Sequence, residues 1–554
     1  MRSDACEPVP IPAGTRLLAL AGIVAIMMLG LLLRWQHLLN SDFMFDGDEA
    51  STALMGLHIA KGQHFPLIWY GQHYMGTIDA FISALGFYWF GISPVVHKLT
   101  LLLYAAAAMA LLAWTSWRLW GWMPSWLAVA LFAVAPAAIR WQTDATTAYS
   151  ILFPFAIGLM ACSVQMLCAL VRNGADSSMG MLYGWAILAG IAFWMESLVV
   201  SLIVSLPLIV WLRGDQISKK ALTIAVGCFL LGITPLLVHN IEYPFATLRV
   251  FLGFFLDIAS RSQVEGGSVI QVIARGLWMR IDPTVWGMSL LAALRGPGYG
   301  PAGILAPVGY GAIVILLSLV GSALVAWIRE ARRKGWREWL KSGEGALLSW
   351  LLLSIGLVIF LGSTRARYLV LLVPLLSLLI IGNWSSALFN QSTQRVLVVC
   401  LLLYLMAVSV TLNIINPVRV ANPYPALAEF LEAKGLRYGY AEYEIAYPLM
   451  FFAQERIIVS PLAGPTMLDR YPRYTIAVEQ TTSPFYIYKA TEPLLQVLTT
   501  YLQEHGIQFE TSVVDHHVVI WWLSRAVRPD EFLQATYLAL YRREHYSHPR
   551  AVIY

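Results

Sequence analysis

Three carboxylates stand close together in the acidic segment (residues 44–51), namely Asp46, Asp48 and Glu49. They follow the first long apolar stretch of the chain by only a few residues. Charged groups close to the apolar part of a bilayer are costly, and they usually mark a substrate path or a reacting site. A carboxylate can take a proton from an attacking hydroxyl, and several carboxylates together can hold a cation. The acidic segment is therefore the first candidate for chemistry.

The acidic segment also has the form of a helix start. Asp46-Gly-Asp-Glu49 matches the D-x-x-E pattern of a capping box, and residues 50–60 follow with helical spacing before Gly62. A second helix is expected from about residue 76 to 90, where Phe, Tyr and Trp are typical of a membrane interface. Both are predicted to be surface helices. Capping a helix needs only one acid, so capping alone explains the three acids less well than a role in chemistry does.

Two more groups of polar residues lie in predicted outer loops. The stretch 66–76 mixes aromatic, amide and histidine side chains, which suit a sugar but can also simply pack the loop. The short loop 362–368 carries two arginines, whose forked donors suit a phosphate, although contact with lipid headgroups is an open alternative. The candidate substrate-binding residues are Tyr70, Gln72, His73, Tyr74, His239, Asn240, Glu242, Arg365, Arg367 and Tyr368.

Cofactor and disulfide patterns are missing from the sequence. The segment 416–554 contains no glycine fingerprint for a nucleotide, no P-loop, no nucleophile elbow and no zinc spacing. Four of the five cysteines lie in predicted membrane spans, so no disulfide framework is expected. No cofactor is predicted with certainty, and a divalent cation held by the acids and a histidine stays open. The metal site is therefore unknown at this level.

The composition is that of a polytopic α-helical membrane protein. Of 554 residues, 58% are hydrophobic and 12% are charged, about half the charged fraction of an ordinary soluble domain. Apolar runs able to cross a hydrocarbon core of about 30 Å predict eleven spans. These runs cover approximately 16–38, 98–117, 124–140, 147–171, 181–195, 197–212, 220–239, 302–328, 346–362, 368–388 and 396–415.

The basic residues predict how the chain is oriented in the membrane. Short loops rich in Lys and Arg stay in the cytoplasm, and the run from Arg329 to Lys341 alone holds six basic residues. This rule places the N-terminus inside, with two long outer loops at 40–97 and 240–301. The transmembrane module then covers 1–415, and 416–554 forms a domain outside the cytoplasm. The net charge of +5 reports this orientation, so no nucleic-acid partner is expected.

The segment after residue 416 predicts a small α/β domain. Helical patterns cover 426–434 and 492–505. Strand-like runs cover 456–459, 474–478, 508–514 and 518–523. Its tyrosines, among them Tyr438, Tyr440, Tyr443 and Tyr447, are expected to form the core and surface of this domain.

The order of these features resembles a known family. A first span, an outer loop with Asp48-Glu49, Gly71-Gln72, Met75-Gly76, many further spans and an outer C-terminal domain are similar to the GT-C membrane glycosyltransferases. The likeness is greatest to bacterial relatives of protein O-mannosyltransferases and of the lipid A aminoarabinose transferase. It implies a polyprenyl-phosphate sugar as donor and an acidic residue of the first outer loop acting at the acceptor. By this resemblance Asp48 is the expected base, while the extra acid, Asp46, departs from the pattern.

The resulting hypothesis is an inverting transfer of one sugar from a polyprenyl-phosphate donor to a glycan, lipid or protein acceptor. The expected location is the bacterial inner membrane, where membrane lipids surround the protein. A transporter or flippase of a lipid-linked sugar is the first alternative, although it should carry charged or broken segments near mid-membrane. A polymerase or ligase with a diphosphate-linked donor is the second alternative.

Overall fold

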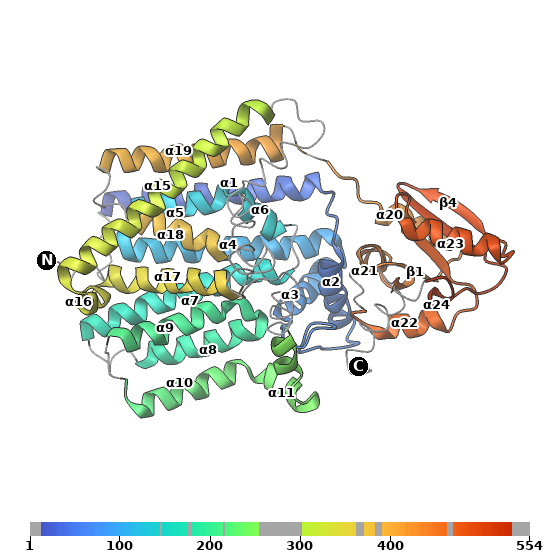
Figure 1. The fold of residues 1–554 in the computed structure, drawn as a ribbon, viewed down its shortest axis with the longest axis horizontal. Helices are drawn as coiled ribbons and strands as arrows, with labels where there is room; N and C mark the ends of the chain where they lie inside the picture. Colours follow the sequence, from blue (N-terminus) through green and yellow to red (C-terminus); the bar gives the residue numbers. More distant parts are fainter. Residues whose placement is uncertain are drawn as a thin grey trace, which may run out of the picture.

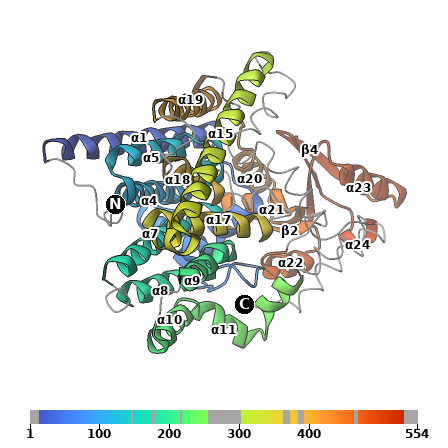
Figure 2. The ribbon, with the colours of Figure 1, turned by 60° about the vertical axis from the view of Figure 1, so that its left-hand side comes forward.

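The structure is a computed structural model in which a helical bundle carries a small sheet-containing domain at one end (Figure 1). Turning the molecule shows the same arrangement from another side (Figure 2). The residues that the structure describes are 13–143, 147–173, 179–213, 217–253, 302–361, 371–382, 391–415, 417, 419–462 and 469–533.

The bundle contains helices that match the predicted spans in position. Among the described residues, five helices are long and apolar enough to cross a membrane, or up to seven if each bent pair is one span. Each of the eleven predicted spans overlaps an apolar helix or a bent pair, and their number stays a prediction. The helices are α1 (Arg16–Asn40), α4 (Pro94–Trp120), α5 (Trp122–Val134), α6 (Pro136–Thr143), α7 (Thr147–Asn173), α8 (Met179–Met195), α9 (Val200–Arg213), α10 (Lys219–Gly232), α11 (Thr234–Glu242), α15 (Ala302–Lys334), α16 (Trp336–Lys341), α17 (Gly343–Leu361), α18 (Leu372–Gly382) and α19 (Gln391–Val410).

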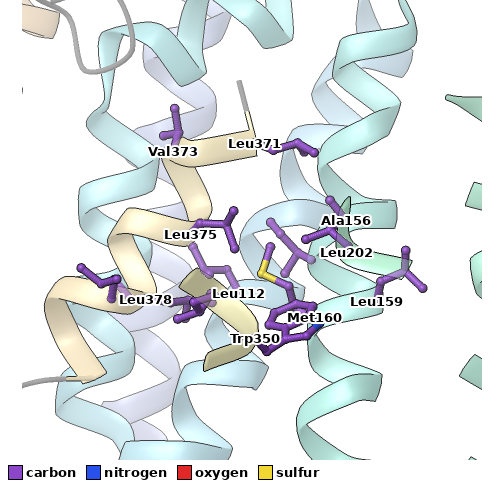
Figure 3. Packing of buried hydrophobic residues seen from close by; sticks show 14 of the residues in the cluster. Leu112, Ala156, Leu159, Met160, Leu202, Trp350, Leu371, Val373, Leu375 and Leu378 are labelled. Carbon is purple, nitrogen blue, oxygen red and sulfur yellow. The ribbon is translucent and has the colours of Figure 1, made fainter. Parts of the chain in front are cut away.

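The core of the bundle is apolar and fully enclosed (Figure 3). Leu112 of α4, Met160 of α7 and Leu202 of α9 pack in one cluster with residues of α17 and α18. Trp350 of α17 is completely buried in the same cluster. In contrast, only 17% of the apolar window of α1 is buried, as expected for a helix that faces lipid.

A break between α5 and α6 is satisfied by side chains from other helices. The two helices meet at 59° at Pro136, which has no N–H to continue the helical hydrogen bonds. Arg34 Nη1 donates to the carbonyl of Ala133 at 2.9 Å, and Ser409 Oγ donates to that of Val134 at 2.7 Å. Backbone groups in a membrane must be paired within the protein. The buried Arg34 therefore has a structural task at this break.

The first outer loop forms the two predicted helices, α2 (Gly47–Ala60) and α3 (Ile78–Phe90). The predicted cap is confirmed, because Asp46 Oδ1 accepts a hydrogen bond from the N–H of Glu49 at 2.7 Å. The prediction of a surface helix is wrong for α2, since twelve of its fourteen residues are buried. It is covered by α3 and by the C-terminal domain. Helix α3 does expose a large apolar face, at Leu85, Tyr88, Trp89 and Phe90.

The C-terminal domain is built on a five-stranded mixed sheet of order β2-β1-β3-β5-β4. Strand β1 pairs in parallel with β2 and β3, whereas β5 pairs antiparallel with β3 and β4. Its elements are α20 (Tyr424–Ala433), β1 (Tyr438–Glu442), α21 (Tyr443–Phe452), β2 (Ile458–Leu462), α22 (Pro472–Glu479), β3 (Phe485–Lys489), α23 (Pro493–Glu504), β4 (Glu510–Val514), β5 (His517–Trp521) and α24 (Pro529–Phe532).

One predicted strand of this domain is wrong. The run 474–478 belongs to helix α22, which begins with Pro472 in its first turn, a position that favours helix. Its buried residues are Tyr474, Thr475 and Val478, which share one helical face against β2. The two central strands β1 and β3 were not predicted. The predicted helices at 426–434 and 492–505 and the other three strands are confirmed.

The sheet domain and the first outer loop share one hydrophobic core. Leu54 of α2 and Tyr70 of the following loop pack in the same buried cluster as Tyr447 and Phe451 of α21. Glycine at position 47 permits this close approach, because a Cβ there would lie 2.5 Å from the ring of Tyr443. The acidic segment is therefore enclosed between the bundle end and the C-terminal domain.

Candidate functional site

The three acids of the acidic segment lie at the start of α2, and each has different partners. Asp48 faces the C-terminal domain, where Arg470 Nη2 contacts its Oδ1 at 2.9 Å. The hydroxyl of Tyr443 donates to the same oxygen at 2.6 Å. The Asp48 side chain is 25% exposed, whereas that of Arg470 is 4% exposed. Asp48 is thus a carboxylate that solvent or a substrate can reach and that two donors hold in place.

Arg470 is itself held from several sides. Its Nε donates to the hydroxyl of Tyr443 at 3.2 Å, and its backbone N–H donates to the hydroxyl of Tyr447 at 2.7 Å. Its guanidinium lies 4.5 Å from the centre of the Trp69 ring, a cation–π contact. Burial alone would lower the pKa of Arg470, but Tyr443 and Asp48 raise it above its usual value. The guanidinium therefore stays charged.

Glu49 is completely buried and paired with a lysine of the bundle. Lys98 Nζ of α4 lies 2.8 Å from Glu49 Oε2 and donates at the same distance to the carbonyl of Thr143 in α6. His97 Nε2 lies 3.7 Å from the other oxygen of Glu49. Neither Glu49 nor Lys98 is exposed to solvent. This ion pair therefore joins α2 to the bundle and is not accessible to a substrate.

Asp46 caps α2 and faces a different space from Asp48. Burial is the main cause that raises the pKa of Asp46 well above its usual range, and Glu49 and Asp48 raise it further. Asp46 lines a cleft of about 860 Å³ between the end of α1 and the C-terminal domain. The cleft also contains Glu444 of α21, whose Oε2 accepts from the N–H of Gly47 at 2.8 Å. Lys489 and His517 at the sheet line its other side.

At several positions of the loop 66–76 the side chains pack inside the protein and are not exposed. Tyr70 is buried, and its hydroxyl lies 2.7 Å from His58 Nδ1 and 3.0 Å from His64 Nδ1. Gly71 has a φ of +68°, and a Cβ there would lie 3.2 Å from Cα of Arg470, so glycine allows the loop to approach this arginine. Gln72 and Tyr74 are half-buried in the same loop.

Three other predicted residues meet on the opposite side of this loop. His73 Nδ1 lies 3.0 Å from His239 Nε2 of α11, although 166 positions separate them. Thr247 joins the group, because its hydroxyl donates to the carbonyl of His73 and receives a hydrogen bond from Asn240. Glu242 is exposed at the end of α11. The structure thus brings His73, His239 and Asn240 together.

The remaining predicted residues fall outside the described part of the chain. These are Arg365, Arg367 and Tyr368, together with residues 254–301 of the second outer loop. Within the residues that the structure describes, no group of three His, Cys, Asp or Glu side chains is arranged to hold a metal ion. The divalent cation stays a prediction of the sequence.

A second set of contacts joins the far end of α2 to the C-terminal domain. Glu455 Oε1 lies 2.8 Å from His58 Nε2 and accepts from the hydroxyl of Tyr474 at 3.0 Å. Lys61 Nζ lies 3.1 Å from Glu455 Oε2. Burial by itself would raise the pKa of Glu455, but the hydrogen bonds and charges of His58 and Lys61 outweigh it and lower the pKa to about 2.

We expect Glu455→Gln to weaken the docking of the C-terminal domain, because the ion pair with Lys61 is lost and the contact with His58 no longer involves a carboxylate. A carboxylate whose pKa is lowered by folding stabilises above its unfolded pKa, here 4.5, and loses that contribution as the pH falls toward 2. The stability gap between wild type and variant should therefore be constant above pH 4.5 and shrink below it. Thermal unfolding in detergent across pH 3 to 7 measures this gap, and a gap that grows on acidification contradicts the assignment.

Comparison with known structures gives a match over most of the chain. The chain is similar to ArnT. Two crystal structures of ArnT from Cupriavidus metallidurans, one bound to undecaprenyl phosphate and one in the apo state, have TM-scores of 0.45 and 0.44. Their sequences are 15% and 14% identical to this chain, and each comparison covers 92% of this chain and 98% of that chain. No family model and no curated protein sequence matches.

The lipid A aminoarabinose transferase, whose bacterial relatives the sequence resembles, is thus among the solved structures to which this chain is similar. Sequence reasoning missed three residues of the site, Arg470, Tyr443 and Lys98. Lys98 had a signal, because a charged residue at the start of a predicted span should have a buried partner. Arg470 had none, since 422 positions separate it from Asp48.

Proposed function

We propose that this chain is a membrane glycosyltransferase that moves one sugar from a polyprenyl-phosphate donor to an acceptor outside the cytoplasm. The observation that carries the proposal is the contrast among the acids at the bundle end. Asp48 is accessible and held by Arg470 and Tyr443, whereas Glu49 is enclosed with Lys98. An accessible, oriented carboxylate next to a membrane bundle fits a base for an acceptor hydroxyl. The sequence resemblance supports the same role for Asp48.

The reaction is a single displacement at the anomeric carbon. The acceptor oxygen forms the new bond to that carbon, its proton passes to the Asp48 carboxylate, and the bond to the lipid phosphate breaks. A displacement of this kind, with one carboxylate as base, inverts the anomeric centre. The lipid phosphate leaves with the bonding electrons, and Arg365 and Arg367 are proposed to stabilise its charge.

The cleft beside Asp46 is proposed to hold a part of the acceptor remote from the reacting hydroxyl, because Asp48, the proposed base, does not line it. It offers carboxyl oxygens at Asp46 and Glu444, an ammonium at Lys489 and the aromatic side chain of Tyr424. Binding sites for small molecules commonly combine a concave apolar surface with a few such polar groups. His73 of the first outer loop, together with His239 and Asn240 at the start of the second, is proposed to contact the sugar of the donor. The orientation in the inner membrane, with this end outside, follows from the basic loops.

A transporter of a lipid-linked sugar is the second candidate. It is favoured by two bent helix pairs in the bundle, α5 with α6 at 59° and α10 with α11 at 65°. The contacts of Arg34 weigh against it, because this buried arginine donates to Gln142 and to backbone carbonyls at the α5–α6 break. In addition, helix α2, which begins at the acids, lies at the end of the bundle rather than midway along it (Figure 1).

Purified protein with labelled polyprenyl-phosphate sugars tests the choice between enzyme and transporter. Mannose, glucose and aminoarabinose carriers are offered in turn, with and without EDTA, and release of the lipid phosphate is measured. We expect turnover of one donor. Loss of that turnover in EDTA assigns a metal requirement. Flip of an intact labelled donor across proteoliposomes without any release of lipid phosphate contradicts the proposal and supports the transporter.

A further inference from the structure

The C-terminal domain contributes side chains directly to the acidic segment. Arg470, which precedes α22, and Tyr443, at the start of α21, both contact Asp48. We infer that the C-terminal domain completes the reaction site by supplying Arg470 and Tyr443 as positioning residues that hold the Asp48 carboxylate in one orientation. This inference rests on the proposed role of Asp48 as the base. The C-terminal domain would then take part in the reaction in addition to covering the end of the bundle.

Both donors contact the same oxygen of the carboxylate. The Arg470 Nη2 and Tyr443 hydroxyl contacts are to Oδ1, at 2.9 and 2.6 Å. Within the described residues, Oδ2 of Asp48 accepts no hydrogen bond, and a quarter of the side chain is exposed. The two donors hold one carboxylate oxygen, and the other is proposed to meet the acceptor hydroxyl. Orientation of this kind is what a base needs before proton transfer.

Arg470 supplies a positive charge among the carboxylates of the acidic segment. Carboxylates close in space favour the protonated form of one another. Lys98 compensates Glu49 and Arg470 compensates Asp48, whereas the pKa of Asp46 is raised by burial and by these two neighbours. The other titratable groups near the start of α2 are Glu444, which accepts from Gly47, and His97, which faces Glu49. Without Arg470, Asp48 would stand among like charges with only a neutral hydroxyl as donor.

The position of Arg470 depends on both domains at once. Its backbone is anchored by Tyr447 of α21, and its guanidinium lies over Trp69 of the first outer loop. Tyr447 is fully buried and Trp69 is 5% exposed, so the arginine has little freedom to move. The orientation of the Asp48 carboxylate is therefore linked to correct docking of the C-terminal domain on α2.

Variants of Arg470 test this link. We expect Arg470→Gln to lower the turnover number at least tenfold while the KM for the donor stays within about twofold, because the arginine orients the base and does not bind the donor. Arg470→Lys keeps the charge but loses the planar, forked donor pair of the guanidinium, so it should restore only part of the turnover number. The matched control is Arg456→Gln, an exposed arginine of the same domain that pairs with Glu432. The control should change neither quantity.

A measurement without substrate separates this inference from the proposed function. Carbodiimide labelling of Asp48 at one fixed pH, read by mass spectrometry, reports how firmly the carboxylate is held by its donors. We expect faster labelling in Arg470→Gln and an unchanged labelling rate in Arg456→Gln. Tyr443→Phe, which removes only the hydroxyl, provides a milder variant that should lower the turnover number. An unchanged labelling rate in Arg470→Gln overturns the inference even if the wild type turns over a donor, and a faster Arg470→Gln enzyme does so as well. Absence of donor turnover in the wild type, with faster labelling in Arg470→Gln, contradicts only the proposed function.

Discussion

Replacing Asp48 by Asn is expected to reduce sugar transfer by about 10²–10⁴-fold, the usual contribution of a general base. The amide cannot take the proton of the acceptor, but its carbonyl oxygen can still accept from Arg470 and Tyr443, so the protein should remain folded in the membrane. Initial rates of lipid-phosphate release, measured at saturating donor on purified protein, give the size of the loss.

Asp46→Asn is the matched control for this variant. Asn is as good a helix cap as Asp, so α2 should keep its start. Because Asp46 faces the cleft and its pKa is raised, the control also asks whether the base is Asp46. Full activity of Asp48→Asn together with loss in Asp46→Asn would move the base to Asp46 and reject the assignment made here.

Replacing Lys98 by Met is expected to destabilise the protein by about 3–5 kcal/mol, because it leaves a buried carboxylate without its partner. Glu49 and Lys98 are both fully enclosed, and the lysine also pairs with the carbonyl of Thr143. Equilibrium unfolding in mixed detergent measures the loss. The change should be visible without any substrate, since the pair joins α2 to α4 and α6.

The double variant Glu49→Gln with Lys98→Met should recover a large part of this loss, because no charge is then left buried. Lys334→Met serves as the control, since Lys334 is an exposed partner of Glu330 on α15. Exposed pairs contribute about 0–1 kcal/mol, so the control should remain close to wild type. A Lys98→Met protein as stable as the control would mean that Glu49 is not held as a buried ion pair.

The acidic segment illustrates how much local sequence determines. The cap at Asp46, helix α2 and helix α3 follow from side chains that interact within three or four positions, and each was predictable. The apolar spans follow from composition over about 20 residues, which the bilayer thickness requires. The resemblance to ArnT rests on the order of such local features along the chain.

The domain at the end of the chain shows where local patterns fail. Tyr440 and Ala441 on β1 are buried next to one another, so this central strand lacks the alternation that marks a half-exposed strand. The segment 474–478 has the β-branched and aromatic residues of a strand, but Pro472 and the packing on β2 make it a helix. In both cases burial by neighbouring elements outweighs local propensity.

The sequence by itself determined that this is a membrane protein with an acidic segment after its first apolar stretch and with helices to present it. Only the tertiary structure decided what each acid does. Asp48 meets Arg470 across 422 positions, and Glu49 meets Lys98 across 49. No local pattern encodes such pairs, because a buried charge is stabilised by whichever opposite charge the folded chain brings beside it. The division of the three acids into an oriented carboxylate, a buried ion pair and a helix cap therefore arises from the packing of the C-terminal domain and the bundle around α2.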